Sequence, residues 1–230
     1  MRAPKMRPPD ASTAGLREAL AEGGHALALD LTDSQLDTLL AYLALLQRWN
    51  ATYNLTAVRE PAQMLTQHLA DCLAVVEPLR RHCATASSKR VLDVGSGGGL
   101  PGIVIAALNP GLQVTCVDTV GKKAAFIRQA AGELGLKNLV AEHARVEQLR
   151  AAPFDVIVSR AFSSLADFTR LTRQNLAPRG VWMAMKGKTP DEEMAQLPAD
   201  LAVFHVEQLS VPGLQAERCL VWIRPQPPSL

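Results

Sequence analysis

The stretch VLDVGSGGGLPG, from Val91 to Gly102, places five glycines directly behind a short apolar run. Two overlapping nucleotide-binding patterns share these glycines. In the first frame, Asp93 begins an acid-x-G-x-G-x-G pattern that continues through Gly95, Gly97 and Gly99. The second frame, GGGLPG from Gly97 to Gly102, is a formal G-x-G-x-x-G match, which alone is a weak signal for a dinucleotide. The frame that is used decides what the chain binds.

The charge pattern around the glycines favours the first frame. A dinucleotide brings a pyrophosphate, which needs bare N–H groups at a helix N-terminus and no acid nearby. Here Asp93 lies at the end of the expected strand, and Pro101 has no N–H to offer. S-adenosylmethionine has no phosphate and carries a sulfonium and an ammonium, which an acid can help to hold. The glycines would then let the backbone approach this ligand closely.

A second acid follows at the spacing of a nucleoside site. Nineteen residues after Gly99, the run QVTCVD ends in Asp118, where the second strand is expected to finish. A carboxylate at that place can bond ribose hydroxyls, in NAD as well as in S-adenosylmethionine. Asp118 therefore supports a nucleoside without choosing between the two, and its alternative interpretation is a solvated acid in a loop.

Strand-like runs alternate with helical segments on both sides of the loop, from residue 86 onward. This alternation predicts an α/β fold with right-handed βαβ units and a doubly wound parallel sheet. The last two strand-like runs, LAVFHVEQLSV and RCLVWIRP, are separated only by the turn-rich PGLQAE. A helical crossover does not fit into that interval, so these two runs are expected to pair antiparallel.

Residues 1–85 are expected to form an N-terminal tail and a helical segment, and residues 86–230 the α/β domain, so that the chain is either one domain with an appendage or two small domains. Thr32 and Gln35 have capping-box spacing just ahead of a helical run, and Pro61 can begin the next helix. The start, MRAPKMRPPD, is expected to be a frayed tail. One apolar face of the first helical run is predicted to contain Leu36, Leu39, Leu40, Leu43, Leu46 and Trp49.

Composition excludes several classes. The 24 Lys and Arg against 22 Asp and Glu leave a net charge of +2, so an RNA-binding face must be local. The longest apolar run, LLAYLALL, is far shorter than the roughly 20 residues that cross a bilayer. The histidines lack metal-ligand spacing, so we expect no metal, and the scattered cysteines suit small core positions in a reducing cytoplasm. These residues are His25, His68, His82, His143, His205, Cys72, Cys83, Cys116 and Cys219.

Several stretches together resemble one family. RWNATYNLTAVRE, HLADCLAV, VLDVGSGGGLPGI, VDTVGKKAAFIRQ, ARVEQL, FDVIVSRAFSSL and MKGKTPDEE are similar to the bacterial glucose-inhibited division protein B family. That family methylates guanine N7 in small-subunit (16S) ribosomal RNA with S-adenosylmethionine. The resemblance runs from about Leu31 to Ile223. It implies a class I methyltransferase fold, Rossmann-like, with a mostly parallel seven-stranded sheet and a C-terminal antiparallel hairpin.

The resemblance also implies roles for individual residues. The loop from Gly95 to Leu100 would hold the cofactor, with Asp118 near its ribose and Val146 and Glu147 near its adenine. Arg160, in SRAF, would lie at a strand end facing cofactor and substrate. With the acid of the first frame, the expected cofactor-binding residues are Asp93, Gly95, Ser96, Gly97, Gly99, Leu100, Asp118, Val146, Glu147 and Arg160.

Guanine N7 has a lone pair and no proton, so methyl transfer to it needs no general base. An arginine bonded to N7 would occupy that lone pair. Arg160 and Arg145 are therefore expected to orient the substrate through O6 or phosphates, and the alternative interpretation of each is an ion-pair partner. Asn54 and His68 are expected to reach the site. Alternatively, Asn54 caps a turn and His68 packs in the core. A local basic face for RNA is expected from Lys122, Lys123, Arg128, Lys186 and Lys188, which follow predicted strand ends.

Three functions remain in competition. The leading one is a cytoplasmic, monomeric methyltransferase of small-subunit ribosomal RNA, which it meets as a ribosomal subunit or an assembly intermediate. An NAD-dependent oxidoreductase would use the frame from Gly97 to Gly102, but the terminal hairpin and Asp93 count against it. A non-catalytic RNA-binding module would not need the intact loop, Asp118 or SRAF.

Overall fold

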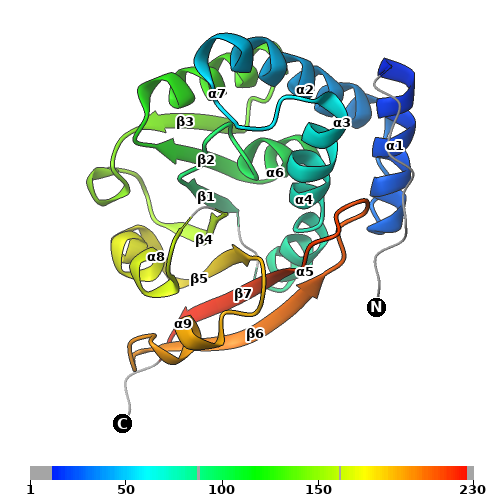
Figure 1. Ribbon diagram of the computed structural model, residues 1–230. Helices are drawn as coiled ribbons and strands as arrows, with labels where there is room; N and C mark the ends of the chain where they lie inside the picture. Colours follow the sequence, from blue (N-terminus) through cyan, green and yellow to red (C-terminus); the bar gives the residue numbers. More distant parts are fainter. Residues whose placement is uncertain (1–11, 87–88, 161, 227–230) are drawn as a thin grey trace.

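A seven-stranded sheet forms the centre of the part of the chain that the structure describes, which is residues 12–86, 89–160 and 162–226 of a computed structural model (Figure 1). The strand order is β3-β2-β1-β4-β5-β7-β6. The first five strands are parallel, and β7 runs antiparallel to both β5 and β6, as predicted for the terminal hairpin. The strands are β1 (Arg90–Val94), β2 (Gln113–Asp118), β3 (Leu139–His143), β4 (Phe154–Ser159), β5 (Leu176–Lys186), β6 (Leu201–Leu209) and β7 (Arg218–Pro225).

Helices precede the sheet and connect its strands. A π-helical segment, Leu65–Ala70, joins α3 to α4, and the short 3-10 turns Val146–Gln148 and Arg173–Asn175 flank β4 and α8. The α-helices are α1 (Thr13–Ala26), α2 (Asp33–Tyr53), α3 (Pro61–Met64), α4 (Asp71–Leu73), α5 (Val76–Ala86), α6 (Gly102–Leu108), α7 (Gly121–Glu133), α8 (Leu165–Thr172) and α9 (Asp191–Ala195). None of the described helices is long and apolar enough to cross a membrane.

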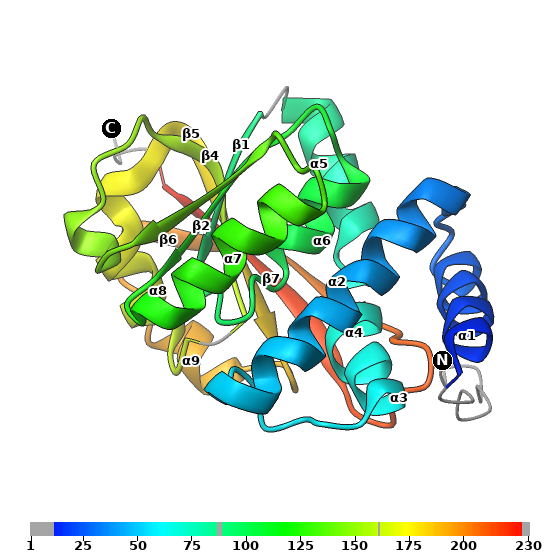
Figure 2. The ribbon, with the colours of Figure 1, turned by 90° about the horizontal axis from the view of Figure 1, so that it is seen from above.

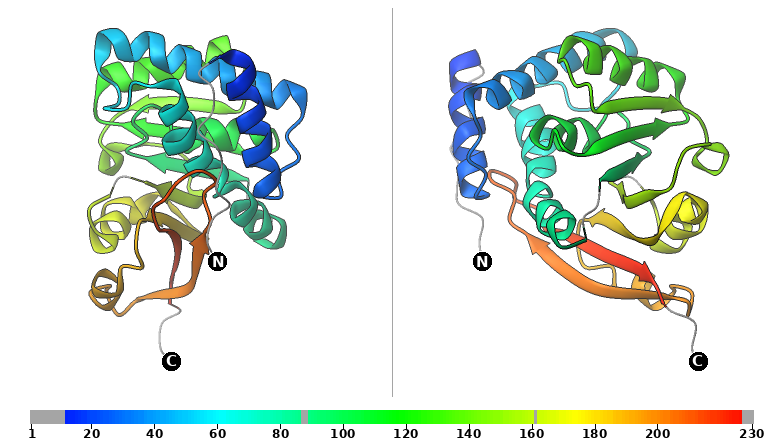
Figure 3. Two further views of the ribbon diagram at one scale, coloured as in Figure 1. Left: turned by 45° about the vertical axis from the view of Figure 1, so that its right-hand side comes forward. Right: turned by 180° about the vertical axis from the view of Figure 1, so that it is seen from behind.

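The two faces of the sheet are buried by different helices, as the alternation of side chains along each strand requires. Val91 belongs to a core that α1, α2 and α4 to α7 share with one face. Leu92 and Val94 belong to a second core, which α8 covers on the opposite face. Figure 3 shows the helices before β1 packed beside the sheet, so the N-terminal segment is part of the same core.

The N-terminal helices form largely as their sequence predicts. Thr32 accepts a hydrogen bond from the Gln35 N–H, and the Gln35 side chain accepts one from the Thr32 N–H, which completes the capping box at α2. Pro61 is the first residue of α3. On the predicted apolar face of α2 four leucines are buried, while Leu40 and Trp49 are partly buried. The tail before Asp10 and residues 87 and 88 of the expected boundary lie outside the described residues.

The carboxyl ends of the parallel strands place two loops next to each other. β1 pairs with β2 on one side and with β4 on the other, so the strand order reverses between β1 and β4. Such a switch point is where open α/β sheets bind ligands. The glycine loop follows β1 and Arg160 follows β4, so both lie at this point.

Candidate functional site

The glycine loop leaves room for a ligand beside two of its residues. Gly95 and Gly97 have φ angles of +68° and +58°, which side chains rarely adopt. A Cβ added at either would meet no described heavy atom within 4 Å. At Gly99 an added Cβ would come within 2.5 Å of Ile103 Cδ1, so this glycine is needed for packing against α6. Gly95 and Gly97 thus face open space, and Gly99 faces the helix.

Asp118 ties the loop to the next strand. Its Oδ2 accepts the Gly97 N–H at 2.9 Å and its Oδ1 accepts the Val120 N–H at 2.8 Å. The N–H groups of Gly95 and Ser96 both donate to Val117 O, at 2.9 and 3.3 Å. Asp118 ends β2 as predicted, and each of its oxygens has a second lone pair for a ligand hydroxyl.

Asp93 is more deeply buried than the sequence suggests. It is the penultimate residue of β1, it is fully buried, and its Oδ2 accepts the Gly102 N–H at 2.8 Å. Its Oδ1 has no hydrogen-bond partner among the described residues. Burial raises the pKa of Asp93 to about 7, although the Gly102 N–H and the Arg160 charge oppose the rise. An acid thus occupies the first N–H of α6, where a pyrophosphate would have to bind.

We expect the pH dependence of stability to change when Asp93 is replaced by Asn. Because the folded-state pKa is about 7 and the unfolded one about 3.8, the stabilisation by Asp93 is complete below pH 4 and is lost as the pH rises through 7. Between these limits the wild type should lose up to about 4 kcal/mol relative to Asp93→Asn. Denaturant unfolding of both proteins from pH 4 to 8 measures this difference. Parallel curves would contradict the raised pKa.

Helix α2, in the N-terminal segment, packs against the glycine loop. The fully buried Tyr42 donates from its hydroxyl to Gly98 O at 2.7 Å. A Cβ at Gly98 would lie 3.3 Å from Leu46 Cδ1, so the loop and α2 are in close contact. The sequence reasoning missed Tyr42, because on an apolar helical face a tyrosine is indistinguishable from any other large core residue.

A cavity of about 460 Å³ opens beside Arg160, within the range of about 300 to 1,000 Å³ that is usual for small-molecule sites. Its lining comes from the π-helical segment, from α4, from the carboxyl ends of β4 and β5, and from the amino end of the antiparallel β7 with the loop before it. Three of the lining side chains are cationic. Its lining residues are Gln67, His68, Asp71, Arg160, Met185, Lys186, Gly187, Leu214 and Arg218.

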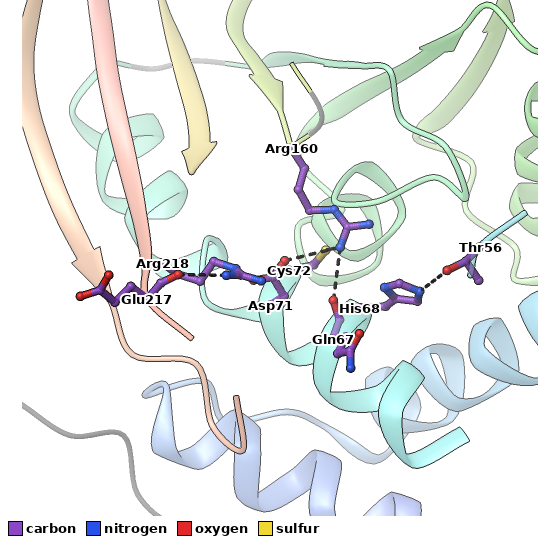
Figure 4. A network of polar contacts seen from close by, with 8 residues as sticks. All are labelled: Thr56, Gln67, His68, Asp71, Cys72, Arg160, Glu217 and Arg218. Atoms are coloured by element: carbon purple, nitrogen blue, oxygen red, sulfur yellow. Dashed lines mark hydrogen bonds and ion pairs between the residues drawn. The ribbon is translucent and has the colours of Figure 1, made fainter. Parts of the chain in front are cut away.

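Asp71 holds two arginines at this cavity (Figure 4). Arg218 Nε donates to Asp71 Oδ1 at 2.7 Å, while Arg160 lies 3.5 Å from Oδ2 and 3.4 Å from Gln67 O. The Asp71 side chain is only 4% exposed, whereas that of Arg160 is 28% exposed. Lys186, also in the lining, pairs with Glu193 at 2.8 Å. One buried carboxylate facing two guanidiniums leaves the cavity attractive to anions and to acceptor atoms.

The two candidates from the N-terminal segment, His68 and Asn54, differ in position: His68 lines the cavity and Asn54 does not. His68 is 9% exposed, its Nε2 lies 2.9 Å from Thr56 Oγ1, and its Nδ1 is buried without a partner among the described residues (Figure 4). Burial, followed by the Arg160 charge, lowers the pKa of His68, so the ring is neutral near pH 7. Asn54 is the C-cap of α2 in the left-handed conformation, and its side chain accepts a hydrogen bond from Arg59. Its position agrees with the alternative in which Asn54 caps a turn.

The remaining candidates lie outside the cavity lining. Arg145 and Glu147 are exposed at a 3-10 turn, and Val146 is buried in the core under α8. Lys122 donates to Tyr53 O at 2.7 Å and Arg128 to Ala141 O at 3.1 Å. The other basic candidates differ in exposure: Lys123 is partly buried and Lys188 is exposed.

Asp71 and Arg218 are the other residues that sequence reasoning missed. A lone acid inside the apolar HLADCLAV is a usable signal for Asp71. Arg218 has no comparable signal, since its position depends on how the last strand enters the sheet. Among the described residues no group of three or more His, Cys, Asp or Glu side chains could hold a metal ion, and all four cysteines are free.

Comparisons with known sequences indicate the same family over most of the chain. A family model described as GidB, rRNA small subunit methyltransferase G, matches residues 35–221. The Ribosomal RNA small subunit methyltransferase G of Acidovorax ebreus (strain TPSY) is 62% identical over 221 residues, covering 93% of this chain and 97% of that protein. The protein of the same name from Leptothrix cholodnii is 63% identical over 210 residues, covering 91% and 96%.

Comparisons with solved structures concern the fold. TrmN from Thermus thermophilus matches with a TM-score of 0.51 at 22% identity, covering 66% of this chain and 48% of that one. The ribosomal protein L11 methylase from Lactobacillus delbrueckii subsp. bulgaricus matches with a TM-score of 0.53 at 16% identity, covering 67% and 78%. The predicted mostly parallel seven-stranded fold with a terminal antiparallel hairpin is confirmed.

Proposed function

The chain belongs to the rRNA small subunit methyltransferase G family, and we propose that it transfers the methyl group of S-adenosylmethionine to N7 of a guanine in small-subunit ribosomal RNA. The observation that carries this proposal is the juxtaposition at the switch point. Ser159 Oγ donates to Val94 O at 2.8 Å, which fixes the end of β4 against the end of β1. Arg160 therefore emerges beside the glycine loop, which supports a substrate site in the cationic cavity next to the proposed nucleoside site.

The residues at the loop fit S-adenosylmethionine. Gly95 and Gly97 leave space at the backbone, and the Asp118 carboxylate can accept from ribose hydroxyls. The buried Asp93, whose Oδ1 has no partner among the described residues, adds an acid at the start of the loop that can help to hold a cation. When bound, the cofactor supplies an electrophilic methyl group on sulfur. The NAD alternative is disfavoured because Asp93 already occupies the Gly102 N–H.

The chain's own contribution to the reaction is orientation. Guanine N7 carries no proton, so no side chain has to remove one. Holding the base and the methyl carbon in line can contribute roughly 7 to 11 kcal/mol. Arg160 and Arg218, anchored on Asp71, can donate to O6 or to a phosphate and leave N7 free. His68 bounds the same cavity as a neutral side chain.

We propose that the substrate is RNA in a ribosomal subunit or an assembly intermediate, and that the enzyme acts on it as a monomer in the cytoplasm. The net charge of +2 is too small for general attraction to RNA, so recognition has to be local. Isothermal calorimetry with S-adenosylmethionine and with NAD tests the cofactor assignment. Binding of S-adenosylmethionine alone supports the proposal, and binding of NAD or of neither cofactor contradicts it.

Asp118→Ala is expected to raise the Michaelis constant for S-adenosylmethionine about 5- to 150-fold, equivalent to about 1 to 3 kcal/mol. The change removes the expected ribose acceptor and also releases the Gly97 and Val120 N–H groups. Turnover at saturating cofactor should change less. Steady-state kinetics with varied cofactor measures both constants.

Asp155→Ala is the matched control for Asp118→Ala. The Asp155 carboxylate also accepts two backbone N–H bonds, from Lys89 and Arg90, but at the opposite end of β1. This variant should leave the Michaelis constant for the cofactor unchanged. Equal effects of the two variants would mean that Asp118 acts only through general stability.

A further inference from the structure

An aromatic ring faces solvent at the end of α2, outside the cavity described above. Tyr53 is 43% exposed, and its ring packs on Trp49 with the centroids 4.8 Å apart. Trp49 in turn meets the fully buried Phe126 of α7 edge-on at 5.5 Å. This ladder of three rings fixes the exposed ring to the core. Tyr53 therefore presents an exposed aromatic surface that its contacts with the core hold in place.

Two cations accompany this ring. Lys122 Nζ donates to Tyr53 O at 2.7 Å, and an Arg59 NH2 group donates to Asn54 Oδ1 at 3.0 Å. Both acceptors are neutral, and both cations are exposed. Among the described residues neither cation forms an ion pair with a carboxylate. Two exposed cations that pair with no carboxylate among the described residues thus lie next to Tyr53.

The ring also lies on the same edge of the molecule as the proposed site. α2 runs antiparallel to α7, and α7 begins where β2 ends (Figure 2). On α2, Tyr42 contacts the glycine loop eleven residues before Tyr53, which is about 16 Å at 1.5 Å per residue. A nucleic acid strand of a few nucleotides can bridge that distance. A base near the target can therefore reach Tyr53.

We propose that Tyr53 is a stacking platform for an unpaired RNA base that flanks the target guanine, with Lys122 and Arg59 binding the adjacent phosphates. The inference rests on the proposed function. Proteins that hold single-stranded RNA combine aromatic faces with cations that follow the backbone. An aliphatic side chain can shield Trp49 from water as well as tyrosine does, but it cannot stack on a base. Tyr53→Leu therefore separates stacking from simple shielding.

The test is single-turnover methylation of small ribosomal subunits purified from cells that lack this gene. Tyr53→Leu should raise the half-saturating subunit concentration about tenfold or more and leave the dissociation constant for S-adenosylmethionine unchanged. Tyr53→Trp, which keeps a stacking face, should stay close to wild type. Phe204→Leu is the matched control, because Phe204 is another exposed aromatic, on β6, at 39% exposure. It should behave as wild type.

The salt dependence separates the ring from the cations. Lys122→Ala and Arg59→Ala should each reduce the slope of log affinity against log salt by about one, and Tyr53→Leu should leave the slope unchanged. Wild-type affinity of a folded Tyr53→Leu protein, or an equal loss in Phe204→Leu, would overturn the platform while the enzyme's activity stands. A wild-type protein that does not methylate the subunits would overturn the proposed function, and the platform with it.

Discussion

Gly97→Val is expected to weaken binding of S-adenosylmethionine on the order of 100-fold or more, which corresponds to about 2.7 kcal/mol or more. The open space beside Gly97 Cα is the space assigned to the ligand, and a branched side chain would fill it. The φ of +58° adds strain to any side chain at this position. Calorimetry on the purified variant measures the affinity, and no methylation should be detectable.

Gly135→Val is the matched control for Gly97→Val. Gly135 has a φ of +66°, and a Cβ there also meets no described atom within 4 Å, but it follows α7 near the opposite edge of the sheet. The two variants should lose similar stability, of about 1 to 3 kcal/mol, and only Gly97→Val should lose the cofactor. Unchanged affinity in a folded Gly97→Val protein would remove the loop from the cofactor site.

Arg160→Lys is expected to slow the methyl-transfer step on the order of 100-fold, while the affinity for S-adenosylmethionine stays within about threefold of wild type. Lysine keeps the charge but loses the planar fork that can hold O6 or a phosphate through two bonds. The contacts of Arg160 to Asp71 and Gln67 are long, 3.5 and 3.4 Å, so an internal ion pair does not consume the guanidinium. A surface ion pair would tolerate the change at less than about 1 kcal/mol.

Single-turnover methylation of small subunits by Arg160→Lys provides the measurement, with thermal melts as the check on folding. Arg80→Lys is the control, because Arg80 bonds Asn109 and Leu108 O at the far end of α6. It should retain the wild-type rate. A near-wild-type rate in folded Arg160→Lys would make Arg160 a structural residue.

The same experiment across pH tests the absence of a general base. At saturating cofactor the transfer rate should lack an ascending limb near neutral pH, since N7 has no proton to lose. The pKa of about 7 of Asp93 should affect the Michaelis constant for the cofactor instead. An ascending limb at saturation would identify a catalytic base that the proposed mechanism lacks.

The architecture was predictable because it depends on local patterns. The change from helical to strand periodicity, the capping box at Thr32 and the short interval before the last strand each determine one element. Even the burial of Asp93 follows from alternation, since Asp93 shares its face of β1 with Val91, under α6. The sequence reasoning placed Asp93 only along the strand, and so missed that its carboxyl points inward.

The cavity was less predictable because it depends on how distant elements pack. The hairpin was expected, but its second strand, β7, lies inside β6 in the sheet, and this order brings Arg218 to the carboxyl edge. Asp71 meets that arginine only because α4 packs beside the sheet. No periodicity in either segment encodes the contact. The roles proposed for Arg145, Val146 and Glu147 stay predictions.

The most direct test of the central claim is to map N7-methylguanosine in small-subunit ribosomal RNA from cells with and without this gene, each complemented by wild type or by Gly97→Val. One N7-methylguanosine should disappear with the gene, return with the wild-type chain and stay absent with Gly97→Val. An unchanged set of N7-methylguanosines after deletion would contradict the account.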